Sequence, residues 1–586
     1  MVCQGEARGE LVSMNDVSKV SGGGRQAMGR AIHPGSGRRK SAPFPKGRVL
    51  KQAELDAVRA LLGDAPRERT LLLEYLHLIQ DAEGALPAGL LQALAEELAI
   101  PMAEVYEVAT FYAHFDVLAD GEPRPAKITV RVCDSLSCML AGAEELLRAL
   151  AKENLAEVRV LRAPCIGSCD TAPAAEVGHR HVDRATSAQL TALARAGEVH
   201  PVLPAYQDFA AYQRAGGYAV LRACLAGQRP REAVINTLSE GGLRGLGGAG
   251  FPTGRKWSLV RAEPAPRLMA VNGDEGEPGT FKDRYYLERE PHRFLEGMLI
   301  AAWAIEADEV FIYLRDEYPA VRLILKAELA KVEAAGLIGH SKVSVRRGAG
   351  AYICGEESAM IESIEGKRGY PRHRPPYVAQ VGLFGRPTLV NNIETLYWVP
   401  IILDRGAQWF AAQGKNGAKG LRSYSVSGRV RQPGVVLTAA GATARDLIAL
   451  CGGMAEGHNF KGYLPGGASG GILPAYLADI PLDFGQLEKH GCFVGSHAVV
   501  ILSDQDDMKA VALNLMRFFE DESCGQCTPC RNGTEKAVQL LAAGNWDADL
   551  HADLGQVMGD ASICGLGQAA PNPVRSVFRF FPEDLR

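Results

Sequence analysis

The chain has 586 residues, an apolar content of 47% and a formal net charge of −4. This length predicts several domains, and the near balance of charges argues against nucleic acid as a partner. No apolar run approaches the roughly 18 residues of a membrane span. The thirteen cysteines fit a reducing compartment, so we expect a cytoplasmic protein.

Two segments come before the first cysteine cluster. Residues 1–48 are rich in Gly, Ser, Arg and Lys, which predicts a disordered basic arm. Residues 49–125 are predicted to form a helical bundle, because apolar residues such as Leu72, Leu76 and Ile79 recur at helical spacing. A last helix of this bundle is expected to open at Pro101 and to continue to Phe115.

Residues 126–203 are predicted to form a small α/β unit that carries four cysteines. Two alternating runs, 128–132 and 158–161, predict strands, and a pair of cysteines follows each of them. The four cysteines could present their thiolates to one [2Fe-2S] cluster: Cys133, Cys138, Cys165 and Cys169. Zinc and disulfides are the alternatives. Disulfides are disfavoured because nothing marks the chain for export. A thioredoxin-type redox pair would use Cys-x-x-Cys, which residues 126–203 lack.

Residues 204–420 are predicted to be a longer α/β region with a glycine-dense loop at 242–257. A GxGxxG pattern runs from Gly245 to Gly250, but no clear strand precedes it, so the usual dinucleotide-binding context is missing. Backbone amides in such a loop can approach a phosphate or a flat ring, and a helix starting near Lys256 adds a positive end. A flexible loop is the alternative.

Three polar clusters follow in the same region. Residues 271–283 come after a strand-like run, where carboxylates could accept ribose hydroxyls or a nicotinamide amide. Residues 348–358 combine glycines with acids. Residues 390–395 contain paired asparagines, whose amides both donate and accept and so suit a flavin's pyrimidine edge. Singly, each cluster could also be a solvated turn.

The last two segments end in a second cysteine set. Alternation at 424–428 and 435–437 predicts strands within residues 421–505. Residues 506–586 are predicted to be helical, with Met508, Val511, Leu515 and Phe518 on one face. The spacing of the cysteines that follow is typical of a [4Fe-4S] cluster: Cys524, Cys527, Cys530 and Cys564. A zinc site is less favoured because no second Cys-x-x-Cys pair lies near Cys564.

Five further cysteines are scattered through the chain and are predicted to be buried thiols: Cys3, Cys224, Cys354, Cys451 and Cys492.

Taken in order, these motifs resemble the flavin subunit of respiratory NADH dehydrogenase, preceded in the same chain by its small [2Fe-2S] subunit. The resemblance covers about residues 49–586. It implies a multidomain α/β and α+β protein. After the helical bundle come a thioredoxin-like [2Fe-2S] domain at 126–203, a Rossmann-like FMN and NAD(H) domain at 204–420, a ubiquitin-like β-grasp (SLBB-like) domain at 421–505 and a four-helix-type [4Fe-4S] domain at 506–586.

The resemblance also implies roles for individual residues. The residues matched to the flavin loop and its phosphate are Gly245, Gly247, Gly248, Ala249, Gly250 and Lys256. Those matched to the flavin pocket are Asn272, Asp274, Glu275, Gly355, Glu356, Asn391, Asn392 and Thr395. Those matched to the nicotinamide nucleotide are Phe251, which stacks on adenine, a second aromatic at Tyr377, and the acids Glu277 and Glu357. One departure is Leu246, where many members have arginine.

The partner is suggested only by likeness. Residues 369–377, 464–474 and 481–484, together with Leu246, resemble the flavin subunit of soluble molybdenum- or tungsten-dependent formate dehydrogenases. This implies a separate pterin-containing catalytic subunit with further iron–sulfur clusters. The diaphorase of an NAD-reducing hydrogenase, an NADH:quinone oxidoreductase and a non-enzymatic cluster scaffold or interaction module stay open.

The implied cofactors are FMN, NAD(H), one [4Fe-4S] and one [2Fe-2S] cluster, and they define an electron converter. A nicotinamide exchanges a hydride, clusters exchange single electrons, and a flavin can connect the two. We expect no residue to act as acid or base, since Glu277 and Glu357 only position the nucleotide. Their charges would also repel a 2′-phosphate, which favours NAD over NADP. The [2Fe-2S] cluster is predicted to lie off the main path.

Overall fold

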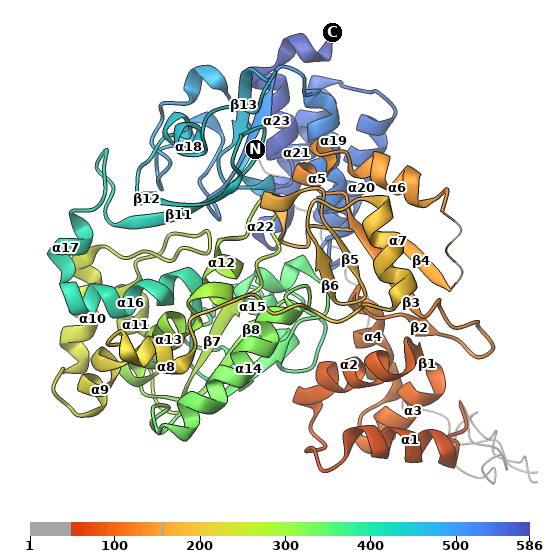
Figure 1. Ribbon diagram of the computed structural model, residues 1–586, viewed down its shortest axis with the longest axis vertical. Helices are drawn as coiled ribbons and strands as arrows, with labels where there is room; N and C mark the ends of the chain where they lie inside the picture. The colour runs from red at the N-terminus through yellow and green to blue at the C-terminus, as the bar shows by residue number, and fades with distance from the viewer. Residues whose placement is uncertain (1–47, 154, 156) are drawn as a thin grey trace, which may run out of the picture. The chain divides into compact units, whose positions relative to one another are not determined.

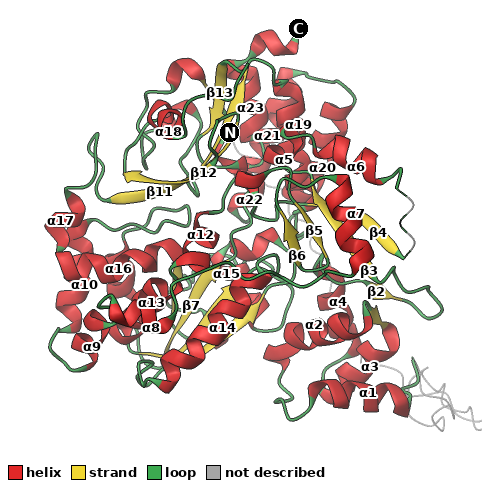
Figure 2. Ribbon diagram, in the orientation of Figure 1, coloured by secondary structure: helices red, strands yellow, loops and turns green. Residues whose placement is uncertain are grey.

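A computed structural model describes residues 48–153, 155 and 157–586 (Figure 1). The predicted basic arm, apart from Arg48, and Cys3 lie outside the described residues. Residues 50–586 make up one compact unit that contains both helices and strands (Figure 2).

The first part is the predicted helical bundle. Its elements are α1 (Gln52–Leu62), α2 (Leu72–Glu83), β1 (Leu86–Pro87), α3 (Ala88–Glu97), α4 (Met102–Phe111) and β2 (Val117–Leu118). Leu72, Leu76 and Ile79 are all buried, as their spacing predicted. The expectation that the last helix continues to Phe115 was wrong. After Phe111 the backbone turns away, and His114 N–H donates to Ala349 O at 3.1 Å, so a long-range contact ends the helix early.

The second part is a four-stranded sheet with helices around it. Its elements are β3 (Ile128–Cys133), α5 (Leu136–Leu140), α6 (Ala143–Leu150), β4 (Val158–Ala163), β5 (Ala175–Val177), β6 (Arg180–Val182) and α7 (Ser187–Ala196). The strand order is β4-β3-β5-β6, with β3 and β4 parallel and the other pairs antiparallel. Cys133 ends β3 and Cys165 follows β4, so the parallel pair delivers both loops to the same edge.

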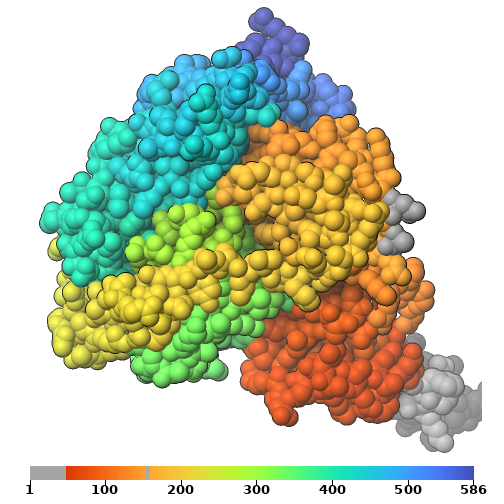
Figure 3. Space-filling model, viewed as in Figure 1, coloured from red at the N-terminus to blue at the C-terminus, as the bar shows by residue number. Residues whose placement is uncertain are grey.

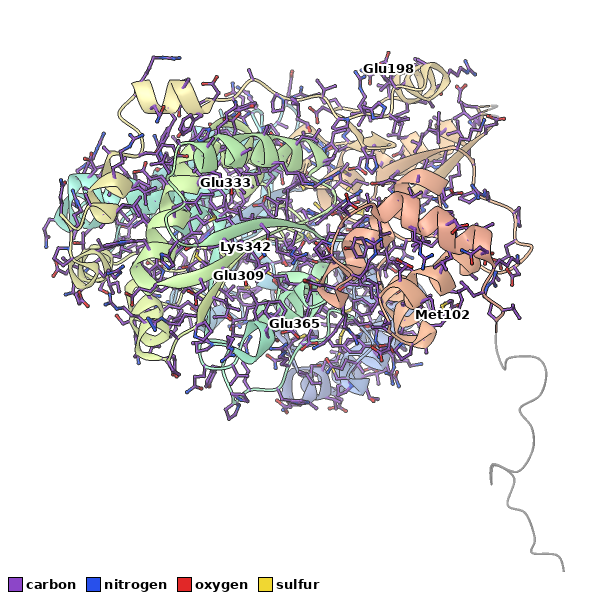
Figure 4. The ribbon with its side chains drawn as sticks, turned by 90° about the horizontal axis from the view of Figure 1, so that it is seen from below. Met102, Glu198, Glu309, Glu333, Lys342 and Glu365 are labelled. Carbon is purple, nitrogen blue, oxygen red and sulfur yellow. The ribbon has the colours of Figure 1, made fainter. Side chains whose placement is uncertain are left out.

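The third part is built on a parallel sheet in the order β10-β7-β8-β9. Its strands are β7 (Arg267–Gly273), β8 (Ala307–Leu314), β9 (Lys342–Arg347) and β10 (Thr388–Asn392). Its helices are α8 (Phe209–Arg214), α9 (Ala219–Leu225), α10 (Arg231–Gly241), α11 (Thr253–Ala262), α12 (Lys282–Arg289), α13 (Pro291–Ile305), α14 (Pro319–Ala334), α15 (Glu357–Ile364), α16 (Ile393–Arg405) and α17 (Ala407–Ala411). Glu309 of β8 and Lys342 of β9 are register partners near one end of the sheet (Figure 4).

Two helices of this part pack unusually closely. A Cβ atom built on Gly297 of α13 would lie 1.9 Å from the carbonyl oxygen of Leu396 in α16. Only glycine allows the two backbones to come this near. This contact fixes α16, whose first residues follow directly from β10, against the rest of the domain.

The fourth part is a five-stranded sheet in the order β12-β11-β15-β13-β14. Its elements are β11 (Leu421–Gly428), β12 (Gly434–Ala439), α18 (Ala444–Leu450), β13 (Phe460–Leu464), β14 (Leu473–Pro474) and β15 (Ala498–Ser503). The hairpin β11–β12 is antiparallel, and β11 pairs in parallel with the last strand, β15. This is the arrangement of a β-grasp sheet.

The chain ends in helices around the second cysteine set. They are α19 (Met508–Asp521), α20 (Thr528–Ala542), α21 (Ala548–Ala561), α22 (Gly565–Ala569) and α23 (Asn572–Phe580). Four of them have 9 to 15 residues and α22 has only 5, which fits a four-helix type of domain. Met508, Val511, Leu515 and Phe518 are buried on α19, as predicted.

A single connection joins the second part to the third part. It leaves α7 at Ala196, reaches α8 at Phe209 and runs over the surface in Figure 3. Along it, Tyr206 donates to Glu328 at 2.8 Å and Gln207 N–H donates to Arg289 O at 2.8 Å. Among the described helices, none has the length and apolar character to cross a bilayer.

Candidate cofactor sites

The C-terminal cysteines converge on one small cavity. Cys524 follows α19, Cys527 and Cys530 open α20, Cys564 immediately precedes α22, and all four line the cavity. Burial raises the pKa of Cys530 to about 11 and that of Cys564 to about 12. Thiolate is the form that binds iron, so these sites need the positive charge of a metal to be ionised at neutral pH.

The other cysteine set is buried and contiguous. Cys165 Sγ lies 3.3 Å from Cys169 Sγ. Hydrogen bonds with Cys138 and then Cys165 raise the pKa of Cys133 well above its ordinary value. The four cysteines therefore gather at one place. Every described cysteine is free, so the disulfide alternative finds no support in the described part of the chain.

The glycine loop lies between α16 and the β-grasp sheet. Gly245 N–H donates to Phe251 O at 2.8 Å, which closes the loop on itself. Leu246 N–H donates to Thr395 Oγ1 at 2.8 Å and fastens the loop to α16. Gly250 has φ +65°, and a Cβ there would lie 2.6 Å from the ring of Phe484. The loop follows α10 rather than a strand, as the sequence indicated.

The asparagines meet at the carboxyl edge of the parallel sheet. Asn272 of β7 is the register partner of Asn392 of β10. Asn272 Nδ2 donates to Gly355 O at 2.8 Å, and Asn392 Nδ2 donates to Asp283 Oδ2 at 2.6 Å. Asn391 accepts a hydrogen bond from Trp257 Nε1 at 2.8 Å. The sheet therefore joins two motifs that are more than a hundred residues apart in sequence.

Two acids stand beside these asparagines, the partly buried Asp274 and the buried Glu275. Asp274 Oδ2 is buried with no hydrogen-bond partner in the described chain, and burial raises the pKa of Asp274 well above its ordinary value. Burial also raises the pKa of Glu275 to about 7, although Asp283 N–H donates to this carboxylate at 2.8 Å. An unpaired buried oxygen costs about 1–3 kcal/mol. A bound group with an N–H or O–H donor would remove that cost.

Glu277 contacts residues that the sequence did not single out. It accepts hydrogen bonds from Ser469 N–H and Oγ, both at 2.7 Å, and from the Tyr352 hydroxyl. Tyr352 also packs edge-on against Phe518, with ring centroids 5.0 Å apart. Tyr352 thus connects the loop that carries Asp274, Glu275 and Glu277, here called the acid loop, to α19, the helix that precedes Cys524. The only hint in the sequence was that Tyr352 lies within the glycine-and-acid cluster at residues 348–358.

Lys256 lies close to the adjacent acids Glu356 and Glu357. Lys256 Nζ lies 3.3 Å from Glu357 Oε2 and donates to Val390 O at 3.0 Å. Glu356 caps α15 by accepting from Ala359 N–H at 3.1 Å. Arg374, which the sequence did not single out, contacts both glutamates and lies 3.2 Å from Glu357. The charge of Glu357 is therefore shared between two cations.

Three predicted residues lie at the outside of this group. Ala249 is exposed, Phe251 is 38% exposed and Tyr377 is 58% exposed. Arg255 lies 5.7 Å from the ring of Phe251. No ring contact joins Phe251 to Tyr377 in the described structure. Both rings are free to take a flat partner.

Arg315 connects the [2Fe-2S] cysteines to the acid loop. Its guanidinium donates to Cys165 O and to Glu275 O, each at 2.6 Å. It is 5% exposed and lies directly after β8. Sequence reasoning missed it, although its place at the end of a strand in a parallel sheet could have marked it.

Protein-family models match most of the chain. The "thioredoxin-like [2Fe-2S] ferredoxin" model matches residues 58–198, and the "Nuo51 FMN-binding domain" model matches residues 238–401. The "SLBB domain" model matches residues 423–473, and the "NADH-ubiquinone oxidoreductase-F iron-sulfur binding region" matches residues 510–586. The first of these spans both the helical bundle and the small α/β unit, which the sequence analysis treated as two domains.

Whole proteins and a solved structure agree with these matches. The F 2 subunit of NADH-quinone oxidoreductase from Rhizobium meliloti is 40% identical over 394 residues, which are 64% of this chain and 92% of the relative. The mitochondrial NADH dehydrogenase [ubiquinone] flavoprotein 1 of Dictyostelium discoideum is 40% identical over 61% of this chain and 78% of its own. A crystal structure of NAD+-reducing [NiFe]-hydrogenase in the H2-reduced state is 33% identical with a TM-score of 0.78, over 89% of this chain and 92% of that one. The protein therefore belongs to the family of the NADH-binding flavoprotein subunit of NADH-quinone oxidoreductase, with FMN, [4Fe-4S] and thioredoxin-like [2Fe-2S] domains in one chain.

Proposed function

We propose that this chain is the diaphorase subunit of an NAD-dependent formate dehydrogenase. Electrons from formate, oxidised on a separate molybdenum- or tungsten-pterin subunit, would reach NAD+ through the clusters and FMN, in a reversible reaction. A cytoplasmic location is part of this proposal. The main support for this electron-transfer function is that three candidate cofactor sites are in contact. Arg315 contacts Cys165 and the acid loop, and Tyr352 connects that loop to the [4Fe-4S] domain.

The residues fit the cofactors that the family binds. Four cysteines lining one cavity suit a [4Fe-4S] cluster, and four contiguous buried sulfurs suit a [2Fe-2S] cluster. The unpaired Asp274 oxygen and the side-chain-free glycine loop suit a flavin with its phosphate. Bound FMN supplies the chemistry that joins hydride exchange to single-electron transfer.

The chain's own residues then have positioning roles. The strand-end asparagines and Asp274 would orient the flavin ring, and the glycine loop with Lys256 would face its phosphate. Phe251 and Tyr377 would stack on the nicotinamide nucleotide. Glu277 and Glu357 would hold its ribose hydroxyls and disfavour a 2′-phosphate. No acid–base residue is required, because hydride transfer needs only alignment and exclusion of water.

The formate assignment is supported by residues 464–474 and 481–484, which resemble formate dehydrogenase subunits and lie beside the candidate nucleotide site. Phe484, from residues 481–484, contacts the glycine loop at Gly250, and Ser469, from residues 464–474, binds Glu277. The residues that resemble formate dehydrogenase subunits therefore belong to the candidate nucleotide site. They do not contact the partner subunit's substrate, so they support formate as the electron source only by family resemblance.

The diaphorase of an NAD+-reducing hydrogenase is a second candidate. The hydrogenase structure is similar over 89% of this chain, which includes the [2Fe-2S] part as well as the flavin part. The flavoprotein subunit of an NADH:quinone oxidoreductase is a third candidate, supported by the relatives that share about two thirds of the chain.

Co-purification from the native organism separates these candidates. We expect a tagged chain to carry FMN and iron, and to bring down a subunit that contains molybdenum or tungsten. The complex should produce NADH from formate and NAD+, but not from hydrogen. Nickel in the partner, with hydrogen-dependent NADH formation, would overturn the formate assignment. A purified chain with neither FMN nor iron would overturn the converter function itself.

A further inference from the structure

A second group of metal-binding side chains lies apart from the cysteines. His77 comes from α2, His114 from the loop after α4, and Asp316 from the loop after β8. One nitrogen or oxygen of each lies within 4.8 Å of those of the other two. His77 is 2% exposed, and the side chains of His114 and Asp316 are 9% and 8% exposed. Three separate parts of the sequence thus meet at a buried point.

Each histidine can offer one ring nitrogen to the centre of this group. His77 Nε2 lies 2.8 Å from Gly348 O, so this nitrogen carries the proton and Nδ1 keeps a lone pair. His77 Nδ1 is buried with no hydrogen-bond partner in the described chain. His114 Nδ1 lies 2.8 Å from Asp316 Oδ2, a separation at which both atoms can bind one ion while the proton of His114 moves to Nε2. A metal-binding histidine is held as His77 is, by a carbonyl on the far nitrogen.

Charged side chains surround the group. Arg347 Nε donates to Oδ1 of Asp316, which leaves Oδ2 on the side of His114. Asp81 lies 2.7 Å from Arg347 and offsets its positive charge. Glu176 and His179 face the same cavity beside His114.

We propose that His77, His114 and Asp316 bind a divalent transition-metal ion, with Zn²⁺ as the expected ion. Two nitrogen donors and one carboxylate favour zinc over calcium or magnesium, which prefer oxygen ligands. Ligand atoms of a tetrahedral zinc ion lie about 3.3 Å apart. The three candidate ligand atoms lie within 4.8 Å of one another, so side-chain rotations would bring them to that separation. The cavity beside His114 gives room for a fourth ligand, a water molecule.

Such an ion would join the N-terminal helices to the flavin sheet. His77 and His114 belong to the helical bundle, whereas Asp316 follows Arg315, which donates to Cys165 O and Glu275 O. The metal would therefore fix the loop that connects the [2Fe-2S] cysteines to the acid loop. Its role is structural, and the inference does not depend on which partner supplies electrons.

Zinc content and zinc X-ray absorption test the site on the intact wild-type holoprotein. We expect stoichiometric zinc after growth in zinc-supplemented medium. The absorption fine structure should show nitrogen and oxygen ligands at about 2.0–2.1 Å and no sulfur shell at about 2.3 Å. A sulfur shell would place the zinc at the cluster cysteines and overturn the proposal. Zinc far below stoichiometric would also overturn it.

Variants locate the ion. His77→Ala and His114→Ala should lose most of the zinc and keep the flavin and cluster absorption. The matched control is His340→Ala, an exposed histidine after α14, which should keep zinc at the wild-type level. Asp316→Asn supplies a third variant of unchanged shape if either alanine variant fails to fold. Equal zinc in all folded variants would overturn the assignment.

A stability measurement gives an independent readout. Added zinc should raise the Tm of metal-depleted wild-type protein, because an ion that binds only the folded state stabilises it. The same addition should leave the Tm of His77→Ala unchanged. An equal rise in both proteins would contradict binding at this site.

Discussion

At the scale of single residues, Glu328 shows how this protein stabilises a buried charge. The residue is fully buried on α14 and accepts hydrogen bonds from Lys331 Nζ at 2.7 Å, Tyr206 at 2.8 Å and His292 Nε2 at 2.8 Å. Phe209 N–H adds a fourth bond at 3.1 Å. Burial alone would raise the pKa of Glu328, but these donors lower it to about 2. The carboxylate therefore fastens the connection before α8 to the flavin domain.

Replacing Glu328 with glutamine should destabilise the flavin domain by about 2 kcal/mol at neutral pH, because charge-assisted bonds are lost in a buried place. Thermal release of FMN, followed by flavin fluorescence, measures the change. Because the folded pKa lies below the ordinary value of 4.5, the stabilisation is fully present above about pH 4.5 and disappears as the pH falls towards 2. The difference from wild type should thus be constant from about pH 8 to pH 5.5.

The control for this prediction lies on the same helix. Glu333 is exposed near the end of α14 and is labelled in Figure 4. Glu333→Gln should change the transition temperature little. A Glu328→Gln protein as stable as this control would contradict the role given to the four donors.

At the scale of helices and strands, the contact of α13 with α16 fixes the site geometry. β10 ends at Asn392, and α16 begins at the next residue. Any shift of α16 therefore moves Asn392, and also Thr395, to which the glycine loop is bonded. Close packing of two helices thus determines where two flavin-pocket candidates stand.

Gly297→Ala should separate these helices. The added Cβ would lie 1.9 Å from Leu396 O, so the backbone must move, at a cost of about 3 kcal/mol or more. We expect a lower Tm by calorimetry together with weaker FMN retention. Gly559→Ala on α21 is the matched control, since nothing lies within 4 Å of its added Cβ. Alanine there should stabilise by about 0.5–1 kcal/mol. Equal effects of the two changes would contradict the packing argument.

Elements and cysteines were predictable from the sequence because their signals are local. The apolar spacing of Leu72, Leu76 and Ile79 indicated α2, and cysteine spacing indicated the two sets of cysteines that the structure brings together. The end of α4 was not predictable, since it depends on a hydrogen bond to Ala349 far along the chain. Tyr352, Ser469 and Arg315 were missed for the same reason: their partners are distant in sequence, and no periodicity records such contacts.

At the scale of the whole molecule, the thioredoxin-like part is bound to every other part that holds a cofactor. Arg284 Nε of the flavin domain donates to Gly167 O at 2.9 Å. Ser137 Oγ lies 2.9 Å from Ser427 Oγ of the β-grasp sheet. Asn514 of α19 donates to Asp134 O at 2.9 Å. Hydrogen bonds thus hold the thioredoxin-like part against three other parts of the molecule.

Cys165→Ser tests whether the [2Fe-2S] cluster is needed for turnover. We expect the electron paramagnetic resonance signal of the [2Fe-2S] cluster to be lost. NADH–dye reductase activity should stay at about half of the wild-type value or more, because electrons can still pass directly from the flavin to the dye. Cys224→Ala, a buried thiol in the flavin domain outside both cysteine sets, should keep signal and activity. Complete loss of activity in a folded Cys165→Ser protein that retains FMN would place this cluster on the obligatory path.

The covalent connection between α7 and α8 has a consequence for assembly. Two separate polypeptides would dissociate on dilution and would need matched synthesis. Here one ribosome makes both modules in equal number, and the tether holds them at an effective concentration in the millimolar range. Weak contacts between the modules are then sufficient, so evolution could adjust the polar junction at Arg284 and Gly167 without the risk of losing one of the two modules.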